Sequence, residues 1–572
     1  MSLHPANLAL RLSITLCLAL PALAADQSQF PITSSAQLSE MRSASAHLRG
    51  PNASTADLQE SARQLDTGLA WLDANRERMN GAPALLNERI NLQLARAGVL
   101  ARLGRKDEAL AALEETQTLL WLPQLRRALR ENPDFASLRD EPRFQAVLAT
   151  SRAPERAMQT KALTTIYKDE LSIEERVAGL SLFWAEARHG FAHFDNVPAL
   201  NWDQVYMDYL RKVIAARDTR EYYRVMMQLA PLLRDGHTNI YPPRELTAEF
   251  FSTPPLDTAL AEGKVHVRAV LSASLAERVR VGDEIVSIDG MPVKQYAEEK
   301  VAPFASYSTP QDRDARLYTH QLLAGAADQP VGLGLRGKDG VLREESVARS
   351  GWSDWKAPAP FSFRMLAGDV AYVELRTFEN EEVVEAFLNA LPKIIQAKAL
   401  ILDLRYNGGG NGGYGLRILS HLSSQPIPLA ASYARIDSAV ERTHHGNYFH
   451  WLPIGSGAPY HRPQKYPFTG PVAVLTGPQT YSAAEDMVLS FRAMRRGVTV
   501  GTATGGSTGQ ALNFALPGGG RARICVKRDL LPDGGKFVGL GIAPQVEVRS
   551  TLEDVRAGRD PVLERALQIV SQ

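Results

Sequence analysis

Cysteine is almost absent from the 572 residues of this chain, where Cys17 and Cys525 are the only two. Only one thiol lies beyond the N-terminal apolar segment, so an intrachain disulfide framework and a metal site built from several cysteines are excluded. The net charge is only +1, because 64 basic residues face 63 acidic ones. Without a dominant basic face, nucleic acid is not an expected partner.

Long apolar runs are also missing after the first two dozen residues, which predicts no integral membrane segment in the mature chain. The N-terminus itself has the pattern of a signal peptide over residues 1–24. Arg11 precedes an apolar run from Leu12 to Leu20, and Ala22-Leu23-Ala24 forms an A-x-A cleavage site. We therefore expect an exported protein, either periplasmic or secreted, that starts near Ala25.

The length predicts several domains, and the first of them are helical. Residues 25–60 are rich in Ser, Ala and Gln and are expected to be a linker or an irregular first helix. Residues 61–150 have a helical pattern that resembles a tetratricopeptide repeat around Gly104 and Ala109. An ordinary helical hairpin explains the same pattern, because such repeats need neighbours to bury their faces. Either arrangement would suit contact with a protein partner better than catalysis.

A second helical segment is expected over residues 155–245, and it ends in Asp235-Gly236-His237-Thr238. It also holds His189 and His193 at a spacing that two metal ligands can have. No third ligand accompanies this pair, so we expect no metal there.

Residues 250–350 change to a strand pattern. Lys264 to Val270 alternates with period two, and the turn dipeptides Gly282-Asp283 and Asp289-Gly290 flank a short apolar strand. This Gly-Asp core resembles that of PDZ domains in exported bacterial proteases. The resemblance implies a domain that captures an extended polypeptide at a sheet edge. An unrelated small β domain is the alternative.

Strands and helices alternate over residues 360–550, which predicts an α/β core, and a C-terminal helix is expected over 551–572. In the core, the buried strand Ala399 to Leu404 leads into a glycine run from Gly408 to Gly413. This run is neither a phosphate loop nor a dinucleotide fingerprint. It could turn backbone N–H groups toward a ligand, as an oxyanion hole requires, or it could be only a tight turn.

The stretch from Leu475 to Gln510 is the one on which the functional prediction depends. A buried strand ends there at a turn, and Ser482 follows at the corner before an apolar helix. A hydroxyl at such a corner is exposed, and the N–H groups of the helix start can face a developing oxyanion. However, Ser482-Ala-Ala-Glu485 is also a capping box, so Ser482 could simply cap the helix.

The order of the motifs resembles the tail-specific proteases, also called carboxyl-terminal processing peptidases. Asp-Gly-His-Thr comes first, followed by the PDZ-like core, Asp-Leu-Arg-x-Asn-Gly-Gly-Gly, Thr-x-Ser-Ala-Ala-Glu, Gly-Gly-Ser-Thr-Gly-Gln and Gly-Ile-Ala-Pro. The resemblance covers about residues 170 to 570. It implies a multidomain α+β protein whose core has a crotonase-like fold and whose enzyme class is serine peptidase.

The resemblance also implies the roles of individual residues. Ser482 would be the nucleophile and His237 the general base, as in the tricorn-like subgroup. The alternative lysine base is absent from Thr504 to Thr508. The oxyanion would be held by the N–H of Ala483 and of a glycine in the run from Gly408 to Gly410, with Gly408 and Gly409 as the chosen candidates.

The chain departs from the tricorn-like pattern at the residue that orients the histidine. A glutamate is expected there, and Gly539 stands at its place. Asp235 and Glu547 are candidate replacements, although neither matches a motif position. Glu485 matches the Ser-x-x-Glu motif, and we expect it to have a structural role at the helix start.

These observations together predict an exported serine endopeptidase that hydrolyses unfolded or extended polypeptides without a metal or other cofactor. One alternative is a binding module with a protease fold and no catalysis. A second is a crotonase-type acyl-thioester enzyme that binds coenzyme A, which the signal peptide disfavours. A helical scaffold would leave the ordered set of motifs unexplained.

Overall fold

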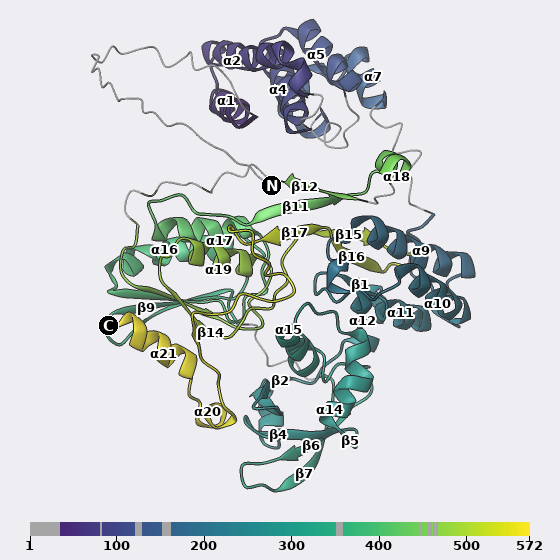
Figure 1. Cartoon of the computed structure of the whole chain (residues 1–572), viewed down its shortest axis with the longest axis vertical. Coiled ribbons are helices and arrows are strands. Elements are labelled where there is room, and N and C mark those ends of the chain that lie inside the picture. The colour runs from purple at the N-terminus through teal and green to yellow at the C-terminus, as the bar shows by residue number, and fades with distance from the viewer. Residues whose placement is uncertain are drawn as a thin grey trace, which may run out of the picture. The chain divides into compact units, whose positions relative to one another are not determined.

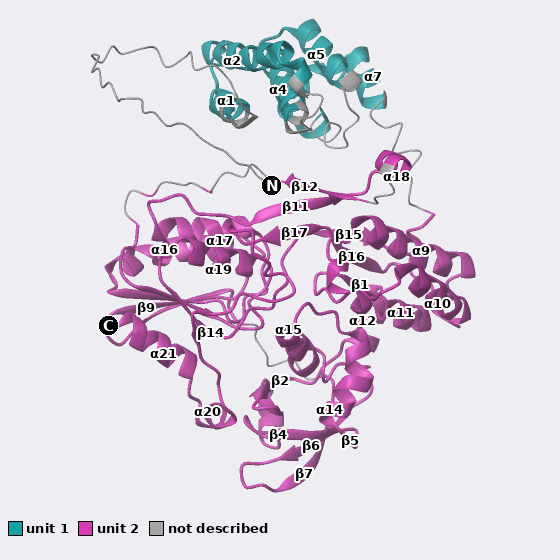
Figure 2. Cartoon of the chain, viewed as in Figure 1, with its two compact units in different colours: residues 1–159 teal, residues 160–572 magenta. Residues whose placement is uncertain are grey.

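The computed structural model describes residues 35–79, 83–119, 129–150, 162–350, 358–445, 449–454, 460, 464 and 467–572. The predicted signal peptide lies outside these residues. The chain divides into two compact units, residues 1–159 and 160–572 (Figure 2).

The first unit is helical in its described part. Its elements are α1 (Ser35–His47), α2 (Thr55–Ala74), α3 (Arg76–Met79), α4 (Pro83–Arg102), α5 (Lys106–Leu119), η1 (Pro133–Leu138) and α7 (Pro142–Thr150). Within residues 25–60, where a linker or an irregular first helix is expected, residues 35–47 form α1, and its Leu38 is buried in a cluster with residues of α2. Gly104 adopts a positive φ of 76° at the turn between α4 and α5, as its position in the sequence predicts.

The second unit begins with the helical segment that carries His237. It contains α9 (Ile173–Gly190), α10 (Trp202–Ala215), α11 (Thr219–Met227) and η3 (Ala230–Leu233). Short strand β1 (Asn239–Tyr241) follows and pairs antiparallel with β16 (Arg521–Cys525), which also pairs with β15 (Ala511–Ala515). This pairing brings the start of the unit to a strand near the end of the chain.

An antiparallel sheet follows, in the order β2 (Leu256–Ala261), β3 (Lys264–Val270), β4 (Glu284–Ile288), β6 (Val331–Arg336) and β7 (Leu342–Val347), with β5 (Met291–Pro292) beside β4. The strand predicted over 264–270 is confirmed as β3. Between β5 and β6 lie α14 (Val293–Tyr296) and α15 (Pro310–Ala315), and α15 reaches the site described below.

The core sheet has the order β18 (Val546–Glu547), β14 (Val498–Gly501), β13 (Val472–Thr476), β10 (Ala399–Asp403), β9 (Val370–Leu375) and β8 (Phe361–Leu366). All neighbouring strands are parallel except β8 and β9. The central strands are near-continuous apolar runs because helices cover both faces of the sheet. Figure 1 shows α16 (Glu382–Gln396), α17 (Gly412–Leu419) and α19 (Ala483–Ala493) on one face and α21 (Pro561–Val570) on the other.

The expected C-terminal helix is two helices rather than one. Helix α20 (Leu552–Ala557) ends at Gly558, which has a left-handed φ of 65°, and α21 starts at Pro561. A further sheet has the order β12 (His450–Ile454), β11 (Ala431–Ile436) and β17 (Lys527–Leu530). None of the helices in the described part of the chain is long and apolar enough to cross a membrane.

Candidate active site

Ser482 lies at the corner between β13 and α19, where the carboxyl ends of the parallel strands meet. Its backbone has φ 53° and ψ −126°, a conformation that costs a non-glycine residue on the order of 1–3 kcal/mol and occurs mainly at functional sites. The N–H of Glu485 donates to the carbonyl oxygen of Ser482 at 2.7 Å. The Oγ of Ser482 is instead in hydrogen-bond contact with a histidine.

That histidine is His237, whose Nε2 lies 3.0 Å from Ser482 Oγ although the two residues are 245 positions apart. Strand pairing between β1 and β16 fixes the turn that carries His237. The imidazole also stacks on the ring of Tyr481, with the centroids 5.2 Å apart and an interplanar angle of 17°. The fold thus brings together the two residues that the sequence resemblance paired.

Burial keeps the imidazole of His237 neutral. The side chain is only 7% exposed, and burial lowers the pKa of His237 to about 4. Asp235 acts in the opposite direction, while Arg523 and Arg316 lower this pKa further. At neutral pH the ring therefore holds a free nitrogen lone pair, as a general base requires.

The orienting partner of His237 is Ser507, which the sequence analysis did not select. Its Oγ lies 2.7 Å from His237 Nδ1. The two predicted candidates make other contacts: Asp235 accepts from Thr238 Oγ1 at 2.6 Å, and Glu547 pairs with Arg549 at 2.6 Å. Neither hydrogen-bonds to His237. The one available signal was that Ser507 lies in the stretch where related enzymes with a lysine base carry that lysine.

Glu485 does more than support the helix start. Its carboxylate is fully buried and accepts from Thr504 Oγ1 at 2.6 Å, Gly506 N at 2.7 Å and Ser507 N at 2.8 Å. It also accepts the N–H of Ser482 at 3.3 Å. Burial raises the pKa of Glu485 to about 7, against the lowering effect of its hydrogen-bond donors. This one side chain therefore connects the nucleophile corner to the loop that presents Ser507.

The glycine run after β10 passes directly beside Ser482. A Cβ on Gly409 would lie 2.6 Å from Ser482 Cβ and 2.9 Å from Ala483 N, so a side chain is excluded there. The N–H of Gly409, one of the predicted oxyanion donors, is directed elsewhere in this structure and donates to Asn407 Oδ1 at 2.9 Å. Gly408 and Gly410 line the cleft instead. Their N–H groups and that of Ala483 meet no acceptor in the described part of the chain.

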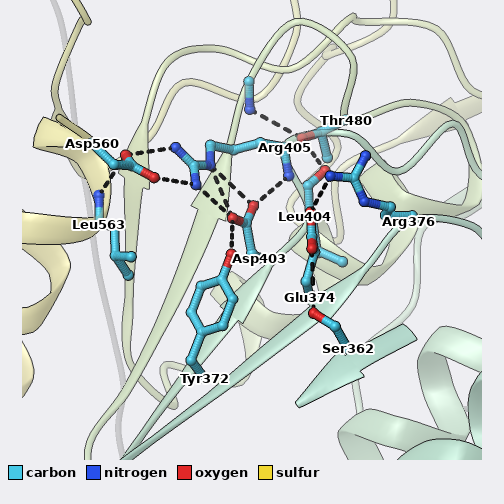
Figure 3. A network of polar contacts seen from close by, with 11 residues as sticks. Ser362, Tyr372, Glu374, Arg376, Asp403, Leu404, Arg405, Thr480, Asp560 and Leu563 are labelled. Atoms are coloured by element: carbon cyan, nitrogen blue, oxygen red, sulfur yellow. Dashed lines mark hydrogen bonds and ion pairs between the residues drawn. The ribbon is translucent and has the colours of Figure 1, made fainter. Parts of the chain in front are cut away.

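A buried polar network fixes the end of β10 before this glycine run (Figure 3). Arg405 bridges Asp403 at 2.6 Å and Asp560 at 2.7 Å, and Tyr372 donates to Asp403 at 2.8 Å. Thr480 Oγ1 donates to the carbonyl oxygen of Leu404 at 2.8 Å. The network links the C-terminal segment, the glycine run and the nucleophile corner.

Helix α15 braces the loop that carries Ser507 from the opposite side. Thr309, which caps this helix, donates to the carbonyl oxygen of Gly505 at 2.9 Å, and Gln311 donates to that of Thr504 at 2.9 Å. Asp312 accepts from the Tyr481 hydroxyl at 3.3 Å. No short motif marks these contacts in the sequence, because they join segments about 200 residues apart.

A cleft of about 620 Å³ opens over Ser482 and His237. It is lined by charged and polar side chains as well as by glycines. These residues include Glu379, Tyr406, Gln479, Gln510, Asn513, Arg316 and Arg523. No cluster of three metal-binding side chains occurs in the parts of the chain that the structure describes.

Residues 369–548 match the sequence profile of peptidase family S41. The protease core belongs to peptidase family S41. The chain is accordingly a serine-type peptidase, that is, a hydrolase. The matched range contains Ser482, Ser507 and the glycine run, whereas His237 and α15 lie before it.

Solved structures share the fold of this chain. Mature CPAF complexed with lactacystin is 16% identical at a TM-score of 0.56, covering 70% of this chain and 98% of that one. Mature CPAF alone gives 17% identity and a TM-score of 0.55, with 70% and 97% covered. The photosystem II D1 C-terminal processing protease is 20% identical, with 69% and 97% covered and a TM-score of 0.42. The similarity to CPAF supports a mixed helix-and-sheet multidomain architecture with an S41-like fold.

Proposed function

We propose that this protein is a serine endopeptidase in which Ser482 is the nucleophile, His237 the general base and Ser507 the residue that orients the base. The observation that carries the proposal is the 3.0 Å contact between His237 Nε2 and Ser482 Oγ at the floor of a cleft. Serine is inert at neutral pH unless a base takes its proton, and a neutral imidazole at this distance is able to do so.

In the proposed reaction, Ser482 Oγ attacks the carbonyl carbon of the scissile peptide bond while its proton moves to His237 Nε2. The developing oxyanion receives hydrogen bonds from the N–H of Ala483 and from Gly408 or Gly410. The carbon–nitrogen bond then breaks, and His237 gives the proton to the leaving amine. Water, deprotonated by His237, hydrolyses the resulting ester and restores Ser482.

Ser507 sets the tautomer of the base in this mechanism. Its hydroxyl oxygen accepts the N–H at Nδ1, which leaves the lone pair of Nε2 directed at Ser482. A hydroxyl stabilises the imidazolium that forms in the transition state less than a carboxylate would. We therefore expect slower turnover than in peptidases whose histidine is paired with an acid.

The expected substrates are unfolded or extended polypeptides, and the expected location is the periplasm or the outside of the cell. Edge strand β2 and the Gly282-Asp283 turn support a PDZ-like domain that adds such a polypeptide to its sheet. The buried parallel strands support a crotonase-like core. A tetratricopeptide-like role in partner binding for the first unit rests on the α4–α5 hairpin.

The test is labelling of the protein from Ala25 onward with a fluorophosphonate serine probe. Labelling is expected in the wild type and is expected to disappear in both Ser482→Ala and His237→Ala, with thermal unfolding showing that both variants fold. Loss only in Ser482→Ala would place the base elsewhere. A folded wild type that neither reacts with the probe nor cleaves casein would contradict the proposal and favour the binding module.

A further inference from the structure

Among the described residues, two arginines line the cleft, Arg316 and Arg523, and they differ in their charged partners. Arg316 is paired with Asp312, with Nε and Oδ1 3.1 Å apart. Within the described ranges of the chain, no acidic residue forms an ion pair with Arg523. Its one hydrogen bond is a long one, from Nη2 to the carbonyl oxygen of Gly236 at 3.4 Å, and its Nε is buried without an acceptor.

The position of Arg523 is set by regular strand pairing. It is the middle residue of β16, opposite Asn239 of β1 and Asn513 of β15. Asn513 also lines the cleft. Gly236, the residue that Arg523 contacts, directly precedes His237. The guanidinium therefore lies beside the catalytic pair on a strand that cannot shift easily.

The Arg523 guanidinium also lies over the Tyr241 ring, 5.7 Å from its centroid. This cation–π contact does not neutralise the charge, and a partly buried cation without a counter-ion is unusual, because burying a charge costs free energy unless the charge is paired. The guanidinium presents its donors in a planar fork that fits a carboxylate in a bidentate way. Glu379 also lines the cleft; it is exposed to water, forms no ion pair within the described ranges, and follows Phe378, whose backbone pairs with Gly410. The cleft thus has an exposed carboxylate near Gly410 and a guanidinium near Gly236.

We infer that Arg523, with Asn513 beside it, forms a subsite for a carboxylate of the polypeptide substrate. The carboxylate would belong either to an acidic side chain close to the scissile bond or to the free C-terminus. This inference rests on the proposed function, since it names the substrate class of the same cleft. Glu379 would disfavour a carboxylate bound near Gly410.

Charge at this subsite also affects the base. Arg523 is one of the groups that lower the pKa of His237. A bound carboxylate offsets the charge of Arg523, so it makes the imidazole a stronger base when the subsite is filled. The substrate would then supply part of the negative charge that the neutral Ser507 does not provide.

The test measures binding to the folded Ser482→Ala protein, so it does not depend on turnover. Three fluorescent peptides that differ only at one position and at the C-terminus are compared by anisotropy. The first has Glu at that position and an amidated C-terminus, and the second has Gln and an amidated C-terminus. The third has Gln and a free C-terminal carboxylate. We expect at least one carboxylate-bearing peptide to bind about tenfold or more tightly than the amidated Gln peptide, as charged hydrogen bonds generally allow. Which of them gains identifies the source of the carboxylate.

The same comparison is made in Ser482→Ala combined with Arg523→Gln, where the gain should vanish. Arg521→Gln is the matched control, because Arg521 is an exposed residue of the same strand that does not line the cleft. Equal binding of all three peptides, or a gain that survives Arg523→Gln, would overturn the subsite. Probe labelling of wild-type Ser482 reports on the catalytic pair independently, so failure of the subsite and failure of the proposed function are distinguishable.

Discussion

Two loops converge on Ser482, and they are built by different means. The loop after β10 depends on backbone: Gly409 leaves room for the nucleophile corner, and Asn407 fixes the turn through Gly409 N–H and the carbonyl oxygen of Leu375. The loop after β14 depends on a distant side chain, since Glu485 of α19 accepts its N–H groups and thereby presents Ser507. The comparison shows that a loop whose backbone passes close to the nucleophile corner needs glycine, whereas a loop that presents a side chain needs an anchor from elsewhere.

The largest loss of stability and activity is expected from removing Glu485, the side chain that anchors the loop after β14. Glu485→Ala leaves several buried donors without an acceptor, so we expect the free energy of unfolding to fall by about 3 kcal/mol and kcat by about 100-fold or more. Denaturant unfolding and casein cleavage measure the two effects. Glu547→Ala is the control, because this exposed acid pairs only with Arg549 among the described residues, and both quantities should stay near the wild-type values. A Glu485→Ala protein with normal kcat would show that the loop holds its shape without this carboxylate.

The first loop should be sensitive to a single methyl group. Gly409→Ala places a Cβ 2.6 Å from Ser482 Cβ at a φ of 95°, and the loop must move away from the nucleophile. We expect a fall in kcat of about 100-fold, comparable to the loss of one oxyanion donor, because Gly408 and Gly410 move with the loop. In Gly412→Ala the new Cβ meets only Asp486 at 3.7 Å, so normal activity is expected there. Equal activity of the two variants would mean that the glycine run is not tightly fitted.

Ser507 offers a direct comparison of a hydroxyl with a carboxylate. Ser507→Ala should lower kcat by about tenfold with little change in KM, because the imidazole loses its orienting contact but the cleft is unchanged. Ser507→Thr should retain activity. Ser507→Asp should raise the pKa of His237 and move the acid limb of the pH–rate profile to higher pH. An unchanged pH profile in Ser507→Asp would remove Ser507 from contact with the base.

Titration distinguishes the base from the anchor, because their shifts have opposite signs. The folded-state pKa of His237 is lowered from 6.5 to about 4, so its contribution to stability is complete above pH 6.5 and declines as the pH falls toward 4. The pKa of Glu485 is raised from 4.5 to about 7, so stability from the protonated carboxyl is lost as the pH rises through this range. The free energy of unfolding of the wild type minus that of His237→Gln should therefore rise from pH 4 to 6.5. A flat difference would mean that His237 titrates normally.

The smallest effect on stability is expected from a substitution at the outer edge of the polar network in Figure 3. Asp560 is paired with Arg405 but its side chain is 37% exposed, so Asp560→Asn should cost only about 0.5 kcal/mol. Asp403→Asn should lower the free energy of unfolding several times more, because Asp403 is fully buried and Arg405 would then lack its inner partner. Thermal unfolding of the two variants gives the comparison, and equal losses would contradict it.

The sequence was sufficient to predict the core strands, to select Ser482 and His237, which the fold brings into contact, and to predict the need for glycine after β10. These features have local signals: apolar runs, a strand-to-helix corner and motifs in a known order. Ser507, the N–H partner of Gly409, the brace from α15 and the unpaired Arg523 were not predicted. Each depends on which distant side chain fills the neighbouring space, and a serine or an arginine in a strand or loop has no spacing that identifies its partner.

The pairing of β1 with β16 has a consequence for when the protein becomes active. The turn that carries His237 is held from both sides by β16: residues 239–241 pair with residues 521–523, and Cys525 N–H donates to Thr238 Oγ1 at 3.2 Å. On the proposed mechanism, a chain that stops before residue 521 therefore carries its serine without a positioned base, and it is not expected to cut its own unfolded segments or those of its neighbours. Cleavage would thereby be tied to synthesis past residue 525.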